Sequence, residues 1–232
     1  MVRIKAIIFD LDDTLFDCSG TLVVRGRRKV AKTIAKLISC SEEEAFQLQN
    51  KLEEKYGTKC NVYDYIVAMF DLHPSYGKRL LEEFICIDLS GIALFPSVIE
   101  TLVQLKKQGY KLFLVTFGER LVQKNKIDVL GLGNNYFDKI LIAERNGVKN
   151  KKDHFLEILQ YYNLKSEEVM CVGDKIEDEI LAGKALGMIT VMYEHGRHYK
   201  LFQQKQSVQF KPDYAVRNIS DILELLSELE YK

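Results

Sequence analysis

The chain has 232 residues, of which 47% are hydrophobic and 28% are charged. This balance is typical of a globular protein and argues against a disordered one, and the length suits one large domain or a core domain with a smaller insert. The 33 basic and 33 acidic residues give a formal net charge of zero, so no overall basic field favours nucleic acid or a membrane as a partner.

Five short apolar runs predict the strands of a parallel sheet. They lack strict polar–apolar alternation, as strands buried on both faces do. The runs cover residues 4–9, 110–116, 139–143, 168–172 and 188–193, and helical patterns precede or separate the later ones at 97–109, 119–131, 152–163 and 177–187. The alternation of strand and helix predicts a doubly wound, Rossmann-like α/β fold.

The segment after the first strand breaks this alternation. Residues from about 18 to 92 contain helical patterns such as "KVAKTIAKLIS" and "SEEEAFQLQNKLEEKYG" and no convincing strand. The "SEEE" at 41–44 is a typical helix start, with a capping serine and acids in the first turn. We therefore expect an α/β core domain built from residues 1–18 and 92–232, and a helical domain at 19–91.

The first strand runs straight into acids. The stretch "IKAIIFDLDDTLF" (4–16) places Asp10, Asp12 and Asp13 directly after an apolar run. In an open parallel sheet, ligands bind outside the carboxyl ends of the strands, so Asp10 and Asp12 are expected at the functional edge. We expect Asp13 to be an exposed turn residue without a role as a ligand.

Polar groups also follow the next three strands. These groups are Thr116 in "LVTFG", the lysines 149, 151 and 152 in "GVKNKKDHF", and Asp174 and Asp178 in "VGDKIEDE". Carboxylates from separate strands suit a hard cation such as Mg²⁺. A cation and a lysine can neutralise a phosphoryl group, a hydroxyl can hold its oxygens, and a carboxylate can attack phosphorus. A second carboxyl two residues away can protonate the leaving oxygen.

These residues carry a resemblance. "DLDDTL" (10–15), Thr116, a lysine before an amphipathic helix and "GDKIED" (173–178) resemble the four motifs of the haloacid dehalogenase-like hydrolase superfamily. The resemblance covers the whole predicted core, and the helical insert resembles the C1-type cap domain of that superfamily. An Asp at position 12 implies a phosphomonoester hydrolase, because the dehalogenases of the superfamily lack it.

The resemblance implies a role for each motif residue. Asp10 would be the nucleophile and a metal ligand, and Asp12 would be the general acid and base and bind the metal through its backbone carbonyl. Asp174 would bind the metal, Asp178 would support the metal shell or orient the lysine, and Thr116 would hold the phosphoryl group. The activity implied is Mg²⁺-dependent hydrolysis of a small phosphorylated metabolite through an aspartyl-phosphate.

Two positions differ from the usual motifs. Phe117 stands where the superfamily commonly has Asn; with Asp10, Thr116 and a lysine, this position would surround the phosphoryl group. The third motif commonly reads KPxPxxF, and here the prolines are replaced. The spacing to Phe155 favours Lys149 as the active-site lysine, and a shorter variant of the motif points to Lys151.

The same observations leave three alternative functions open and bear on the cellular location of the protein. A phosphonatase or a sugar-phosphate mutase would use the same core with extra groups from the cap, and a catalytically idle binding or regulatory module would use the same pocket. The five cysteines form no CxxC pair, and no run approaches the roughly 18 to 20 apolar residues of a membrane span. We expect a cytoplasmic protein that binds neither membrane nor nucleic acid; the sequence does not indicate its oligomeric state.

Overall fold

In the computed structural model, which describes residues 3–57, 60–133, 135–144, 147–204 and 211–230, parallel strands form one six-stranded sheet. Their order across the sheet is β3-β2-β1-β4-β5-β6, so the N-terminal strand lies in the middle. The strands are β1 (Ala6–Phe9), β2 (Lys111–Phe117), β3 (Lys139–Ala143), β4 (Val169–Gly173), β5 (Ile189–Tyr193) and β6 (Tyr214–Val216).

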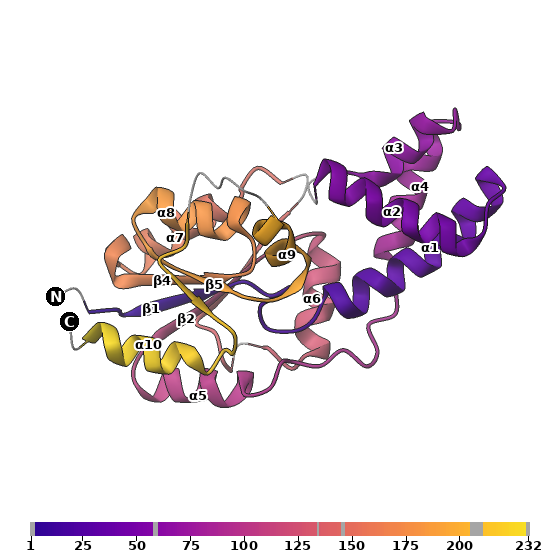
Figure 1. The fold of residues 1–232 in the computed structure, drawn as a ribbon. Helices are drawn as coiled ribbons and strands as arrows, with labels where there is room; N and C mark the ends of the chain where they lie inside the picture. Colours follow the sequence, from indigo (N-terminus) through magenta and orange to yellow (C-terminus); the bar gives the residue numbers. More distant parts are fainter. Residues whose placement is uncertain (1–2, 58–59, 134, 145–146, 205–210, 231–232) are drawn as a thin grey trace. The chain divides into compact units, whose positions relative to one another are not determined.

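Helices cover both faces of this sheet. Figure 1 shows α5 (Val98–Lys107) and α10 (Asp221–Glu230) on one face, and α7 (Lys151–Tyr161) and α8 (Leu181–Leu186) on the other. The remaining helices of this unit are α6 (Arg120–Val129) and α9 (Gly196–Gln204), with a 3₁₀ turn at Ser166–Glu168 and a π-helical turn at Ile176–Ile180. The predicted doubly wound α/β fold is confirmed.

The apolar runs became strands because the sheet buries them. All four residues of β1 are fully buried, and they pair in parallel with β2 on one side and β4 on the other. The edge strand β3 differs from the expectation of a fully buried strand, since four of its five residues are only half-buried. The three-residue β6 and helices α9 and α10 were not predicted.

Residues 19–90 form a separate helical unit, and residues 1–18 and 91–232 form the α/β unit. A π-helical turn at Ser19–Val23 leads into α1 (Val24–Ile38), followed by α2 (Glu42–Tyr56), α3 (Val62–Met69) and α4 (Ser75–Ile85). The Ser41 hydroxyl accepts a hydrogen bond from the Glu44 backbone N–H, and the Glu44 carboxylate accepts one from Ser41, which caps α2. The unit has its own apolar core around Ile34, Ile66 and Leu80.

The cysteines and the helix lengths bear on the setting of the protein. All five cysteines are free thiols, and two of them, Cys18 and Cys171, are buried. Among the described residues, no helix combines the length and the apolar character that a membrane crossing requires.

Because β1 lies in the middle of the sheet, we expect the same Ile→Ala substitution to lower the free energy of unfolding more in β1 than in an edge strand. Ile8 of β1 is fully buried in the core, whereas Ile140 of the edge strand β3 is half-buried. We expect Ile8→Ala to lower the free energy of unfolding by about 2–5 kcal/mol and Ile140→Ala to lower it by clearly less, because a cavity in a fully packed core adds to the lost burial. Urea unfolding followed by circular dichroism measures both. Equal losses would contradict the central placement of β1.

Candidate active site

Two carboxylates at the carboxyl ends of β1 and β4 are buried close together. Asp10 directly follows β1 and is 6% exposed, and Asp174 directly follows β4 and is 1% exposed. The backbone N–H of Asp10 donates to the Val172 carbonyl at 3.0 Å, so the nucleophile candidate is still held by the sheet. One oxygen from each of Asp10, Asp174 and Glu179 lies within 4.8 Å of the others, an arrangement that can hold a metal ion.

Lys151 connects these carboxylates. Its ammonium lies 2.8 Å from Asp10 Oδ1, 2.7 Å from Glu179 Oε2 and 3.5 Å from Asp178 Oδ2, and the side chain is 3% exposed. Lys151 is the first residue of α7, and the Asn150 side chain caps that helix by accepting from the Asp153 backbone N–H. The cap therefore fixes the point from which the lysine enters the site.

Lys149, which the motif spacing favoured, lies elsewhere. It is exposed, and its ammonium pairs with Glu157 Oε2 at 2.8 Å. Hydrogen bonds from Lys139 and from Lys149 lower the pKa of Glu157 to about 2, so this pair stays ionised. Of the two candidate lysines, the structure brings Lys151 to Asp10 and gives Lys149 another partner.

Glu179 is a site residue that sequence reasoning missed. It is 1% exposed, and its Oε1 accepts from the Lys175 backbone N–H at 2.6 Å. A Cβ on Gly173 would lie 2.3 Å from Glu179 Cγ, so glycine leaves the space that this side chain fills. The expected residue, Asp178, is more peripheral, with 23% of its side chain exposed. The adjacent acids in "EDE" give no signal in the sequence of which one points inward.

Burial dominates the electrostatics of the carboxylates around Lys151. It raises the pKa of Asp10 to about 7, against the attraction of Lys151 and with a further rise from Glu179. Burial, followed by the charge of Glu179, also raises the pKa of Asp174 well above its usual range. For Lys151, burial disfavours the ammonium, but Asp10 and Glu179 hold its pKa well above the ordinary value. The ammonium contacts two of the three buried acids, Asp10 and Glu179, and Asp174 has no such contact among the described residues, so a cation would stabilise this cluster.

Thr116 lies at the end of β2, the neighbour of β1. Its side chain is 1% exposed, and its hydroxyl accepts a hydrogen bond from Gln123 Nε2 at 2.6 Å. The next residue, Phe117, has a side chain that is 39% exposed and a carbonyl that accepts from the same Gln123 nitrogen at 3.1 Å. The hydroxyl is thus held at the edge of the sheet where Asp10 lies.

Asp12 has a cation of its own, which sequence reasoning also missed. Lys126 Nζ lies 2.8 Å from Asp12 Oδ1 and 2.9 Å from Oδ2, and Gln123 Nε2 lies 3.1 Å from Oδ2. Burial acts to raise the pKa of Asp12, but the charge and hydrogen bond of Lys126 hold it below the ordinary value. The sequence shows that Gln123 and Lys126 have helical spacing and share one face of a helix. It does not show which strand end that helix face contacts.

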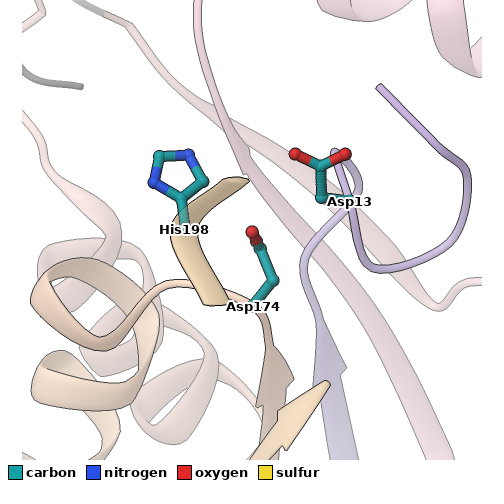
Figure 2. Close-up of side chains that lie close together, drawn as sticks. All are labelled: Asp13, Asp174 and His198. Atoms are coloured by element: carbon teal, nitrogen blue, oxygen red, sulfur yellow. The ribbon is translucent and has the colours of Figure 1, made fainter. Parts of the chain in front are cut away.

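Asp13 corrects one expectation, because it is buried and not an exposed turn residue. It is 2% exposed with a φ of 58°, and a Cβ on Gly196 would lie 2.7 Å from its Cγ. Figure 2 shows Asp13 beside Asp174 and His198, whose potential ligand atoms all lie within 4.8 Å of one another. Burial, followed by the charge of Arg197, lowers the pKa of His198 to about 2, so its imidazole is neutral.

The parallel sheet and the carboxylate–lysine–hydroxyl cluster at its carboxyl edge define a Rossmann-like α/β enzyme. A family model described as haloacid dehalogenase-like hydrolase matches residues 7–193 of the chain. The chain belongs to the haloacid dehalogenase-like hydrolases.

Relatives and solved structures agree with this membership. The chain is 30% identical to a glyceraldehyde 3-phosphate phosphatase of Pyrococcus furiosus, over 97% of this chain and 94% of the relative. It is 26% identical to an N-acylneuraminate-9-phosphatase of Mus musculus, over 99% and 96% of the two chains. A crystal structure of a phosphatase of the same superfamily from Thermococcus onnurineus matches with a TM-score of 0.64 at 25% identity, covering 96% of this chain and 98% of that one.

The raised pKa of Asp10 predicts how its removal affects stability. Because the folded-state pKa is about 7 against 3.8 ordinarily, the folded protein binds more protons between these values and loses stability as the pH rises through them. In EDTA, the melting temperature of Asp10→Asn minus that of wild type should therefore increase as the pH is raised from 5 to 8. Asp128→Asn, which makes the same change at an exposed residue, is the control for the loss of a carboxylate. If the difference in melting temperature between Asp10→Asn and wild type stayed constant from pH 5 to pH 8, the raised pKa of Asp10 would be contradicted.

Proposed function

We propose that the chain is a phosphatase that hydrolyses a small phosphorylated metabolite through an aspartyl-phosphate on Asp10. The observation that carries this proposal is the contact of 2.8 Å between Asp10 Oδ1 and the buried Lys151 ammonium, at the sheet edge that Thr116 also reaches. A buried carboxylate beside a fixed ammonium can attack phosphorus while the ammonium neutralises the phosphoryl oxygens. The phosphatase names of the relatives support the same reaction class.

The reaction would proceed in two steps on these residues. Because Lys126 favours the ionised form of Asp12, Asp12 first takes the proton of the bound phosphate monoanion. Asp10 then attacks phosphorus in line, the bond from phosphorus to the ester oxygen breaks, and Asp12 passes its proton to that oxygen. Asp12 then takes a proton from a water that attacks the aspartyl-phosphate, which releases inorganic phosphate and restores Asp10. Thr116 and the backbone at Phe117 hold the phosphoryl oxygens through both steps, and Lys151 balances their charge.

The acidic cluster fits a divalent cation. Among the residues that the structure describes, none forms a hydrogen bond with the buried Asp174 Oδ2. Asp174 belongs to the group of carboxylates whose oxygens lie within 4.8 Å of one another. Because these donors are all hard oxygens, we propose Mg²⁺ as the ion. Asp10, Asp174 and the Asp12 backbone carbonyl would hold it, with Glu179 and Asp178 supporting. When bound, it would neutralise charge on the phosphoryl group.

The helical unit and the cysteines complete the proposal. The helical unit, residues 19–90, begins nine residues after Asp10. We propose that it acts as the cap that selects the leaving group. The name of the Pyrococcus relative makes glyceraldehyde 3-phosphate the first substrate to test. Five free thiols support a reducing, cytoplasmic location.

A panel of phosphorylated metabolites with Mg²⁺ tests the proposal. We expect wild-type protein to release inorganic phosphate from at least one metabolite, starting with glyceraldehyde 3-phosphate, and EDTA to abolish the release. Asp10→Asn should reduce it to background, because an amide does not attack phosphorus. Wild-type turnover by Asp10→Asn would exclude Asp10 as the nucleophile. Hydrolysis of phosphonates alone would favour a phosphonatase, and metal binding without turnover on the whole panel would favour a binding module.

Two matched lysine variants test which lysine belongs to the site. Lys151→Met should lower kcat/KM by about 100-fold or more, the usual cost of removing a fixed group that stabilises developing charge. Lys149→Met removes an exposed ion pair with Glu157 and should change kcat/KM by no more than about twofold, because exposed pairs contribute little. Initial rates of phosphate release measure both. A larger loss in Lys149→Met would reverse the assignment.

A further inference from the structure

Helix α6 directs two buried polar side chains at the ends of β1 and β2. Gln123 and Lys126 lie three residues apart and so share one face of the helix, and they are 1% and 7% exposed. Between them they contact Asp12, Thr116 and Phe117. Burying an amide and an ammonium lowers stability unless both are paired, so the groups that they contact are part of the reason for their position.

Lys126 fixes the orientation of the Asp12 carboxylate. Its ammonium lies 2.8 Å from one oxygen and 2.9 Å from the other, so the contact is nearly symmetric. Asp12 lies just after β1, where 28% of its side chain is exposed. A contact with both oxygens, joined by the Gln123 amide on Oδ2 at 3.1 Å, restrains rotation of the carboxylate.

Gln123 determines which way the Thr116 hydroxyl donates. Its Nε2 lies 3.1 Å from both Asp12 Oδ2 and the Phe117 carbonyl, and those oxygens accept from it. The amide nitrogen therefore faces this side and also lies 2.6 Å from its acceptor Thr116 Oγ1, so its two hydrogens are shared among three acceptors. A hydroxyl that accepts in this way keeps its own proton for another acceptor. In the proposed reaction, that acceptor is a phosphoryl oxygen.

We propose that Gln123 and Lys126 are positioning residues of the proposed phosphatase reaction. Lys126 holds the ionised Asp12 in the orientation from which it takes up a proton and passes it to the leaving oxygen. Gln123 holds Thr116 as a donor to the phosphoryl group. The inference rests on the proposed function. It extends the site from the strand ends to one face of α6.

A leaving-group comparison tests Lys126. An alkyl phosphate needs a proton on its leaving oxygen, whereas 4-nitrophenyl phosphate hardly does, so only the former depends on a well-placed acid. We expect Lys126→Met to lower kcat/KM by about 100-fold for an alkyl phosphate, the scale of a misplacement of about 1 Å. For 4-nitrophenyl phosphate, the loss should be less than about tenfold. The ratio of the two values does not depend on the fraction of folded protein.

Two further variants sharpen this test. Lys126→Arg keeps two donors for the carboxylate and should restore part of the lost ratio. Lys124→Met changes an exposed lysine of the same helix and should leave the ratio unchanged. Equal losses on the two substrates in Lys126→Met, or no loss, would overturn the positioning role of Lys126. If the wild type hydrolyses neither these substrates nor any metabolite of the panel, the proposed function itself fails.

A double-mutant cycle on product inhibition tests Gln123. Inorganic phosphate serves as the probe, and its inhibition constant should rise about tenfold in Gln123→Met, because the Thr116 hydroxyl is no longer held as a donor. In a Thr116→Val background, Gln123→Met should cause little further rise, since the group that it positions is absent. Asn125→Leu on the exposed face of α6 is the control for the loss of an amide on this helix. Additive effects in the cycle, or an unchanged constant in Gln123→Met, would overturn the role of Gln123.

Discussion

The sharing of one ammonium among buried carboxylates is the constraint on which this site depends. Lys151 contacts Asp10 and Glu179 at 2.8 Å and 2.7 Å, and Asp174 is buried beside them. Bringing each of these charges out of water costs several kcal/mol, so the cluster needs a rigid surrounding that keeps its geometry. The fully buried β1, paired on both sides, and the capped start of α7 supply that rigidity.

Two carboxylates separated by one residue are given opposite environments. Burial raises the pKa of Asp10, whereas the pKa of Asp12 is lowered because Lys126 outweighs the effect of burial. Without a cation this order is the reverse of the one that the proposed roles require, because the carboxyl with the raised pKa is the better proton donor. A divalent cation between Asp10 and Asp174 would favour the ionised form of Asp10 that a nucleophile requires.

The strands and the motif acids were predictable because periodicity and position along the chain determine them. The runs at 4–9 and 168–172 became β1 and β4, and parallel pairing alone brings Asp10 and Asp174 to the same edge. The other groups depend on the direction of a helix face or turn, which spacing does not encode. Gln123 and Lys126 reach the site from α6, and Glu179 rather than Asp178 points inward. The motif spacing favoured Lys149, whereas Lys151 lies at the helix start that faces Asp10.

The position of β1 in the chain has a consequence for the order in which the protein folds. Ala6 of β1 pairs with Lys111 of β2 on one side and with Val169 of β4 on the other. The strand that precedes Asp10 can therefore pair only with two strands that are synthesised much later. At ribosomal rates of 5–20 residues per second, the second partner emerges roughly 10–30 s after β1. Residues 19–90 have a core of their own and complete synthesis in the interval. The acidic cluster, by contrast, is complete only once β4 is made, because Asp174 directly follows that strand.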